Sequence, residues 1–517
     1  MKNIALHNLG CKVNSYETEV MQQKLQEKGY QIVPFDTVAD IYIVNTCTVT
    51  NIADRKSRQM LHRARQLNPW AVVVAVGCYV QTGLQALEED VQVDLAIGNN
   101  RKKDIVEILE AYLEEHSQRL TGGRTVAAVE GNAQDPKAVH PGKTLGGTTV
   151  PEIGQIYEYE EMQLHRTAEH TRAYIKIQDG CNQFCSYCAI PYARGRVRSR
   201  RAEDILEEVR GIVAAGYREI VLTGIHISSY GMEFDPEGWE QGVSIPRWKG
   251  HRLEYGNRGR LIDLVERIHG IPGLERIRLG SMEPRIITEE TAQRLAVLQK
   301  LCPHFHLSLQ SGCDTVLKRM NRQYTTGEYY RSVEILRHAF RSPAITTDVI
   351  VGFPGETEEE FQKTKDFLEK VRFYEMHIFK YSRRTKTVAA SMPGQVPEQV
   401  KTARSNQLLE MERQQSREFR AGYIGSRAEV LLEEIKEIEG RTWALGHTMD
   451  YVKIAVRTGK TGIPTNTGSL TEAGNPDHAG PPGRSEALHN RLCTVWVKGF
   501  LTDEILEAEE RAEELEL

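Results

Sequence analysis

The sequence predicts an α/β protein with three folded units: an N-terminal doubly wound parallel sheet, a central partial (βα)6 barrel and a small C-terminal antiparallel β-barrel. Three observations support this prediction. Short apolar strands alternate with helices over residues 1–116, the alternation resumes six times over 166–396, and short strands of alternating polarity follow residue 425. The chain has 517 residues, which suits about three domains of ordinary size.

Each main strand of the N-terminal unit ends on a cysteine. "NIALHNLGC", "DIYIVNTC" and "WAVVVAVGC" close on Cys11, Cys47 and Cys78, here called the strand-end thiols. Because sites form at the carboxyl ends of parallel strands, we expect these thiols at one edge of the sheet. Three buried apolar cysteines are the alternative. Asn14 is the predicted N-cap of the first helix, which runs to Gly29.

The remaining segments follow in order. Residues 117–165 are rich in Gly, Thr and Pro and are predicted to be a linker or insertion. The barrel strands are expected at "RAYIKIQ", "EIVLTGI", "RIRLGS", "HFHLSLQ", "TTDVIVGF" and "MHIFKYS". The further expected parts are an inserted loop at 234–258, a connecting helix at 397–424, the β-barrel at 425–502 with a loop at 459–485, and an acidic helical tail at 503–517.

Composition narrows the class of protein. The net charge of -5 excludes a molecule that is basic throughout, so any affinity for nucleic acid has to come from local patches. The N-terminus lacks a signal-peptide pattern and no apolar run is long enough for a membrane span. We therefore expect a cytoplasmic protein without a membrane partner. We also expect a monomer. The odd count of nine cysteines favours reduced thiols or metal ligands over disulfides.

A second set of cysteines lies in "DGCNQFCSYCAIPYARGRVRSR". Cys181, Cys185 and Cys188, here called the loop thiols, have the spacing C-x3-C-x2-C. Thiolates suit zinc or an iron–sulfur cluster. A Cys3His zinc site completed by a histidine is one interpretation, and a [4Fe–4S] cluster with one open iron is the other. The candidate histidines are His165, His170 and His226.

The spacing of the loop thiols, with Tyr187 before the third cysteine, resembles the signature of radical S-adenosylmethionine (SAM) enzymes. The resemblance implies that SAM binds the open iron and is cleaved by one electron. The segments "LGCKVNSYETE", "VNTCTVT", "VGCYVQ", "HLSLQSGCDTVLKRMNR" and "TDVIVGFPGET" are similar to one branch of these enzymes, the methylthiotransferases. That similarity implies a second [4Fe–4S] cluster on the strand-end thiols, and a C-terminal TRAM domain that binds RNA.

Among methylthiotransferases, "GCKVNSYETE" and "LTGIHISSYG" resemble the MtaB branch. This implies methylthiolation of N6-threonylcarbamoyladenosine at position 37 of ANN-decoding tRNAs, with a flavodoxin-type or ferredoxin-type reductant and an unknown sulfur donor. The alternatives are the MiaB branch, which acts on isopentenyladenosine, and the RimO branch, which acts on a ribosomal protein aspartate. A non-catalytic zinc protein that binds RNA is the alternative from another class.

Further site residues are expected at the ends of barrel strands, where relatives bind SAM. Beside Tyr187, these candidates are Thr223, Gly224, Gln310 and Gly352. Gln310 is alternatively a strand cap, and Gly352 alternatively serves a turn.

Two groups of arginines are candidate contacts for RNA or substrate. If residues 194–200 are extended, the alternating arginines share one face, where they either hold the fold around SAM or contact phosphate. Pairing with Glu203 and Asp204 on a solvated surface is the alternative. The loop 380–389, "KYSRRTKTVA", departs from the family pattern and supplies candidates for the substrate carboxylate. The candidates in the two groups are Arg194, Arg196, Arg198 and Arg200, and Arg383 and Arg384.

Overall fold

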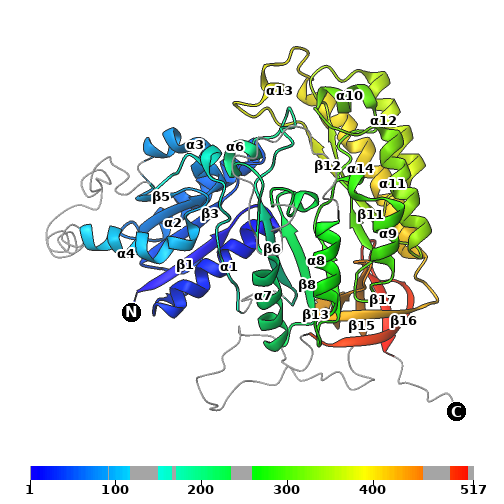
Figure 1. Cartoon of the computed structure of the whole chain (residues 1–517), viewed down its shortest axis with the longest axis horizontal. Helices are drawn as coiled ribbons and strands as arrows, with labels where there is room; N and C mark the ends of the chain where they lie inside the picture. Colours follow the sequence, from blue (N-terminus) through cyan, green and yellow to red (C-terminus); the bar gives the residue numbers. More distant parts are fainter. Residues whose placement is uncertain are drawn as a thin grey trace.

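The computed structural model describes residues 2–90, 92–116, 149–165, 171–234, 259–457 and 490–510. Figure 1 shows the N-terminal sheet domain at the left, the barrel strands in the middle with helices beyond them, and the C-terminal barrel at the lower right. The mixed α/β class is confirmed. Except for Phe234, the predicted insertion at 234–258 lies outside the described residues, and so does the predicted loop at 459–485.

The N-terminal domain is a doubly wound parallel sheet, as predicted. Its strand order is β2-β1-β3-β4-β5. Successive residues of β3 point to opposite faces of the sheet: Ile43 belongs to one apolar cluster and Val44 to another. Helices therefore pack on both faces. Its elements are β1 Asn3–Asn8, α1 Lys12–Glu27, β2 Gln31–Ile32, β3 Ile41–Thr46, α2 Asn51–Leu67, β4 Val72–Gly77, α3 Cys78–Glu88, β5 Leu95–Ile97, η1 Lys102–Asp104 and α4 Ile105–Glu115.

The prediction that Asn14 caps the first helix is wrong. Helix α1 begins at Lys12, directly after Cys11, and Asn14 lies buried in its first turn. The Asn14 side-chain amide donates to the carbonyl oxygens of Leu9 (2.6 Å) and Thr46 (3.0 Å). It therefore ties the ends of β1 and β3 together, which a helix cap would not do.

All six predicted barrel strands are present. They form two parallel sheets, β6-β8-β9 and β10-β11-β12, joined by isolated bridges such as Met282 to Leu307, and a short antiparallel strand, β7, extends the first sheet. The strands are β6 Ala173–Asp179, β7 Arg198–Ser199, β8 Glu219–Gly224, β9 Arg276–Leu279, β10 His304–His306, β11 Ala344–Val351 and β12 Glu375–Lys380. The helices are η2 Ile153–Gln155, α6 Ile190–Arg194, α7 Ala202–Ala214, η3 Ile227–Ser229, α8 Arg260–His269, η5 Pro284–Ile286, α9 Glu289–Ala296, α10 Asp314–Arg319, α11 Thr326–Ala339, α12 Glu358–Val371 and α13 Val388–Ser391.

The two faces of the sheet β10-β11-β12 differ in chemistry. Phe305, Val349 and Met376 belong to the main apolar core, together with residues of α11 and α12. Because side chains alternate along a strand, their neighbours His306, Asp348 and His377 point to the opposite, interior face. The interior of the partial barrel is therefore polar at this sheet.

The C-terminal unit is a closed barrel, with the order β13-β14-β15-β17-β16. All pairings are antiparallel except β15 with β17. The predicted acidic helical tail is wrong in part, because Leu506–Glu510 is the closing strand β17, whose Leu506 and Ala508 are fully buried. Residues 511–517 lie outside the described part. The elements are α14 Glu398–Ala421, β13 Arg427–Ile438, β14 Arg441–His447, β15 Lys453–Arg457, β16 Leu492–Phe500 and β17 Leu506–Glu510.

The predicted linker is described only at its end. Residues 117–148 lie outside the described part, whereas Met162 and Leu164 are buried in the main core. The hydroxyl of Tyr16 on α1 donates to the Met162 carbonyl (2.6 Å). This end of the segment thus packs between the N-terminal domain and the barrel.

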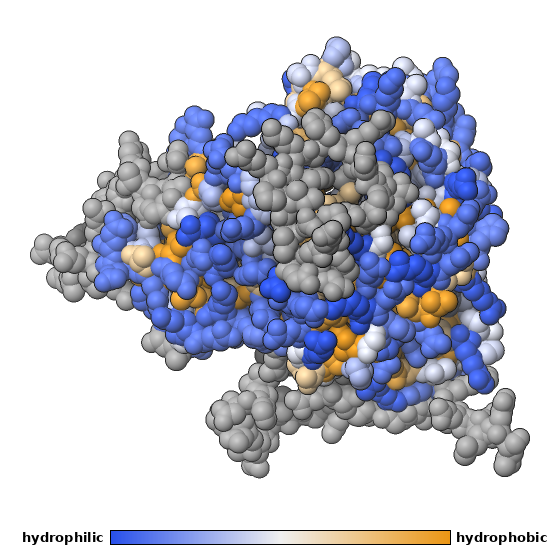
Figure 2. Space-filling model, viewed as in Figure 1, coloured by the Kyte–Doolittle hydropathy of each residue, from blue (hydrophilic) through white to orange (hydrophobic). Residues whose placement is uncertain are grey.

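Figure 2 shows a mainly hydrophilic face with hydrophobic residues in scattered patches. None of the helices in the described ranges combines the length and apolar character that a bilayer crossing requires.

Candidate functional site

The strand-end thiols meet at the carboxyl edge of the N-terminal sheet, as predicted. Cys11 and Cys47 follow β1 and β3 directly, and Cys78 opens α3 after β4. Gly10 has φ +110°, and a Cβ there would lie 3.0 Å from the Cys47 sulfur, so only glycine allows the two loops to approach so closely. Burial raises the pKa of Cys11, and the charge of Cys78 adds to this shift. Burial raises the pKa of Cys47 to about 11, and the charges of Cys78 and Cys11 add to it.

The loop thiols lie between β6 and α6. Gly180, at φ +72°, precedes them, and a Cβ there would lie 1.8 Å from the carbonyl oxygen of Arg196, so the loop requires glycine. Burial and the charge of Cys185 raise the pKa of Cys181, and raise that of Cys188 to about 12. Both thiols are therefore poised to deprotonate only when a metal binds them.

The spacing of the thiols disfavours a single zinc ion. Zn–S bonds of about 2.3 Å keep two sulfurs on one ion within about 4.6 Å. In the described part of the chain, the group of three potential ligands with all atoms within 4.8 Å is His306, Asp348 and His377, and neither cysteine set qualifies. His226 lies 3.5 Å from Glu283, and His170 lies outside the described residues.

Arg194 connects the two cysteine sets. It ends α6, the helix that follows the loop thiols, and is completely buried. Its Nε donates to the sulfur of Cys78 at 3.3 Å. Its two terminal nitrogens donate to Glu17 (2.6 and 3.0 Å), and one of them also donates to Asn14 (2.6 Å). Asn99 approaches the Cys78 sulfur from another side, at 3.5 Å.

Arg194 belongs to a buried charge network in which cations are in excess. Burial alone would raise the pKa of Glu17, but the charges of Arg194, Lys102 and Lys176 hold it well below its usual range. Lys176 also contacts Asp179 (2.7 Å), and Arg198 lies 3.7 Å from the same carboxylate. Four cations against two carboxylates leave two excess positive charges, which suits a negatively charged cluster on Cys78.

The prediction that the arginine row contacts RNA is wrong for three of its members. Arg194, Arg198 and Arg200 are fully buried, and Arg200 pairs with Glu208. The extended period of two fails because Arg194 is helical and the chain turns at Gly195. Arg196 is only half-buried, and its guanidinium lies over the Phe184 ring, 4.6 Å from its centre. The buried arginines hold the fold around the loop thiols.

The loop after β12 is also structural in part. Arg384 is buried and donates to Asp54 (2.7 Å), Asn51 (2.6 Å) and Thr48 (2.7 Å), next to Cys47. It is therefore already paired, and the hypothesis that it binds the substrate carboxylate is wrong. Arg383 is exposed, and its Nε donates to the Ala390 carbonyl.

The candidate SAM residues differ in their surroundings. Thr223 and Gly224 end β8 as predicted, and Tyr187 packs beside Phe353. Gln310 has φ +73°, a costly conformation for a non-glycine residue, and its backbone pairs with β11. Such strain is typical of functional sites.

Gly352 has a packing reason that the sequence did not reveal. It has φ +72°, and a Cβ there would lie 2.1 Å from Cγ of Lys401 on α14. The close approach of α14 accounts for this glycine without a ligand.

Some functional candidates were missed. Arg322 donates to the sulfur of Cys185 (3.2 Å), and Asn321 donates to the Phe184 carbonyl (3.0 Å), so both support the loop thiols. Burial would raise the pKa of Glu283, but His226 and nearby arginines lower it to about 2. Arg322 lies in the segment "MNR". Its positive charge was the one sequence signal that it could contact a thiol sulfur.

Lys12 follows Cys11 and opens α1. Its side chain is exposed, and among the described residues its ammonium has no hydrogen bond or ion pair. Loss of hydration around its ammonium lowers the pKa of Lys12 to about 8, and the positive charges of Arg278 and Arg172 contribute to this shift. Burial, then Arg278 and Lys12, lower the pKa of His304 well below its usual value. Lys12 thus lies within electrostatic reach of the barrel interior.

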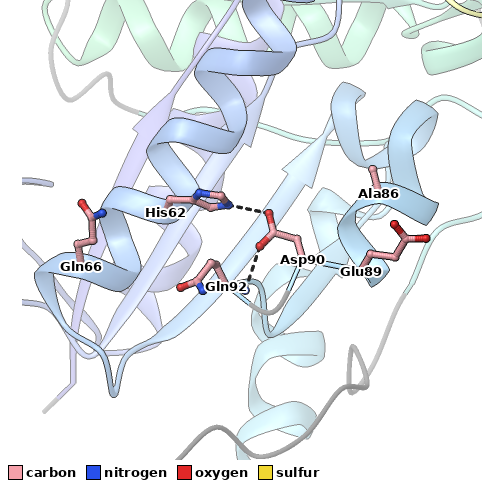
Figure 3. Close-up of a pocket in the computed structure, with 6 residues that line it drawn as sticks. All are labelled: His62, Gln66, Ala86, Glu89, Asp90 and Gln92. Carbon is pink, nitrogen blue, oxygen red and sulfur yellow. Dashed lines mark hydrogen bonds and ion pairs between the residues drawn. The ribbon is translucent and has the colours of Figure 1, made fainter. Parts of the chain in front are cut away.

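A separate pocket lies at the far end of α2 from Cys47. Figure 3 shows His62 and Asp90 facing each other across it, with a hydrogen bond of 2.8 Å. Its other lining residues are Gln66, Ala86, Glu89 and Gln92. It contains no thiol and lies apart from both cysteine sets.

The comparisons with known proteins agree with this geometry. Residues 175–368 match the Radical SAM superfamily, and residues 3–98 match the Uncharacterized protein family UPF0004. The threonylcarbamoyladenosine tRNA methylthiotransferase MtaB of Bacillus subtilis is 38% identical over 88% of this chain and 91% of its own length. The chain belongs to the MtaB-type radical SAM methylthiotransferases.

Two further proteins are similar to this methylthiotransferase. The tRNA-2-methylthio-N(6)-dimethylallyladenosine synthase of Carboxydothermus hydrogenoformans is 34% identical over 82% of this chain and 86% of that protein. The radical SAM methyltransferase TsrM of Kitasatospora setae, solved with cobalamin and a [4Fe–4S] cluster, matches with a TM-score of 0.48 at 18% identity, covering 75% of this chain and 77% of that one. As a radical SAM methylthiotransferase, the protein uses SAM and [4Fe–4S] clusters.

Proposed function

We propose that the protein converts N6-threonylcarbamoyladenosine at position 37 of tRNA to its 2-methylthio derivative. The observation that carries the proposal is the pair of three-thiol sets joined through Arg194, in a chain 38% identical to an MtaB enzyme. The net change replaces the C2–H bond of the base with C2–S–CH3, and SAM is both the methyl donor and the radical source.

The protein's own residues have distinct parts in this proposal. The loop thiols hold the cluster that binds SAM, and the strand-end thiols hold the second one. When bound, the two clusters supply one-electron cleavage of SAM and sulfur for transfer. Arg322 and Arg194 donate to a sulfur in each set and hold the ligands in place. Thr223, Gly224, Gln310 and Tyr187 remain proposed SAM contacts.

The partners follow from the same chemistry. We propose a flavodoxin-type or ferredoxin-type protein as the one-electron donor and the C-terminal barrel as an RNA-binding unit. Of the arginine candidates, Arg196 and Arg383 remain available for phosphate, because the others are buried in ion pairs.

The test is anaerobic reaction of the reconstituted enzyme with tRNA, followed by mass spectrometry of the nucleosides. We expect 2-methylthio product from threonylcarbamoyl-tRNA. A product from isopentenyl-tRNA alone would replace the proposal with the activity named for the Carboxydothermus relative. Replacing all three strand-end thiols by Ala should leave SAM cleavage to 5′-deoxyadenosine intact and abolish the methylthio product. Continued product from that variant would contradict the proposed division of roles.

A further inference from the structure

The barrel interior contains an unpaired cation close to the second proposed cluster. Lys12 is adjacent to the ligand Cys11, and its exposed ammonium has no partner among the described residues. Two neighbouring cations are already paired with carboxylates. Arg278 donates to Glu219 (3.0 Å), and Arg172 donates to Glu433 (2.7 Å). Lys12 therefore supplies a positive charge that no described carboxylate pairs with.

A polar cluster lies on the sheet β10-β11-β12 of the same interior. Nε2 of His306 lies 3.4 Å from Asp348, and the ligand atoms of His306, Asp348 and His377 all lie within 4.8 Å of one another. Thr346 holds Nδ1 of His306 (3.0 Å), whereas Nε2 has no hydrogen-bond partner. His377 is exposed on β12. The cluster thus offers donors and an acceptor to a ligand.

We infer that Lys12 binds the carboxylate of the threonylcarbamoyl group, while the His306–Asp348–His377 cluster binds the uncharged polar part of that group. This inference rests on the proposed function and names the residues that select its substrate. The reacting C2 and the substituted N6 lie on the same edge of the adenine ring, on either side of N1. When C2 faces the strand-end thiols, the side group on N6 is therefore held near the same thiols, within reach of the lysine that directly follows Cys11.

The chemistry of these residues also explains selection against an apolar side group. A carboxylate leaving water needs a cation, and Lys12 has no carboxylate partner among the described residues. An isopentenyl group would offer no hydrogen-bond partner to Lys12 or to His377, which is the costly outcome for polar groups that lose water. Discrimination of this kind is larger than that from shape alone.

The experiment measures anaerobic binding of the holoenzyme to anticodon stem-loops that differ only at A37. One carries the threonylcarbamoyl group, one its neutral carboxamide analogue, and one the isopentenyl group. We expect wild type to bind the carboxylate form roughly tenfold to a hundredfold more tightly than the carboxamide, as for a charged hydrogen bond. Lys12→Gln should remove that ratio and Lys12→Arg should keep most of it. Lys28→Gln, beyond the other end of α1, is the matched control and should change nothing.

The variants separate the proposed role of Lys12 from that of the His306–Asp348–His377 cluster. His377→Leu should weaken binding of the carboxylate and carboxamide forms equally, because it removes a contact to their shared part. Iron content is measured for every variant, since Lys12 adjoins a proposed ligand. If Lys12→Gln loses iron, its binding data are set aside. The inference is then judged by the ratio of carboxylate to carboxamide affinity in wild type and by whether Lys12→Arg keeps most of that ratio.

Three results would overturn the inference. These are equal wild-type affinity for carboxylate and carboxamide, an unchanged ratio in iron-loaded Lys12→Gln, and equal weakening on all three RNAs, which would indicate a phosphate contact. Failure of the proposed function is recognised separately, because wild type would then give no methylthio product from the threonylcarbamoyl RNA.

Discussion

Replacing Arg194 by Met should make the cluster on the strand-end thiols harder to reduce. The guanidinium Nε lies 3.3 Å from the Cys78 sulfur and is completely buried. Hydrogen bonds to sulfur and nearby positive charge favour the reduced, more negative cluster. The variant removes both, so the reduction potential should fall.

The size of the fall follows from the geometry. Unit charges 3.3 Å apart interact by about 5 kcal/mol at an effective dielectric constant of about 20. The added electron is shared by the whole cluster, so we expect about half of this energy, about 2.5 kcal/mol. For one electron that corresponds to a shift of about 0.1 V to more negative potential.

The assay is an anaerobic potentiometric titration read by electron paramagnetic resonance. It uses the protein whose loop thiols are all Ala, so that only one cluster contributes. Arg200→Met is the matched control, because Arg200 is equally buried but pairs with Glu208 away from Cys78. An unchanged potential in iron-loaded Arg194→Met would refute the reasoning. If that variant loses its iron, Arg194→Lys, which keeps the charge, should recover the cluster with a smaller shift.

Three other predictions concern metal content and domain contact. Replacing the loop thiols by Ala should leave about four of roughly eight irons and abolish SAM cleavage; retained cleavage, measured as 5′-deoxyadenosine, would contradict their role. Arg384→Ala leaves Asp54 without its 2.7 Å ion pair beside Cys47, so iron bound to the strand-end thiols should be lost faster to a chelator, and an unchanged rate would show that the contact is dispensable. Single Ser substitutions of the three remaining cysteines should keep iron content and activity near wild type, with some loss of stability because all three are buried; loss of a whole cluster would argue against this. Those residues are Cys302, Cys313 and Cys493.

The sequence predicted best where a local pattern determines the structure. The strand-end thiols followed from apolar strands that close on cysteine, and the six barrel strands from their alternation with helices. The arginine row misled because its period of two assumed an extended chain, whereas the turn at Gly195 depends on packing against distant segments. The sequence of β17 resembled a solvated tail because three of its five residues are Glu. Its Leu506 and Ala508 become buried only when the strand closes the barrel.

The partners of the thiols could not be predicted for a similar reason. Arg194 meets Cys78, 116 positions away in the sequence, and Glu17 lies 177 positions from Arg194. No local signal reports contacts of that range. The motif "GCKVNSYETE" contained Lys12, Asn14 and Glu17, but only the fold shows that the latter two face Arg194 while Lys12 remains free of partners among the described residues.

The position of Glu17 has a consequence for how the protein is made. A ribosome releases the N-terminal sheet before Lys176 and Arg194 emerge, so during synthesis Lys102 is the cation available to Glu17 on α1, and the rest of that carboxylate remains hydrated. Once the barrel segment appears, α1 can dock and the carboxylate can exchange water for its cations. Docking of α1 therefore follows synthesis of the barrel segment. Expressed alone, the N-terminal sheet would keep α1 loosely attached, and the isolated barrel would keep three cations around Asp179 without the charge of Glu17, so neither half is expected to be stable without the other.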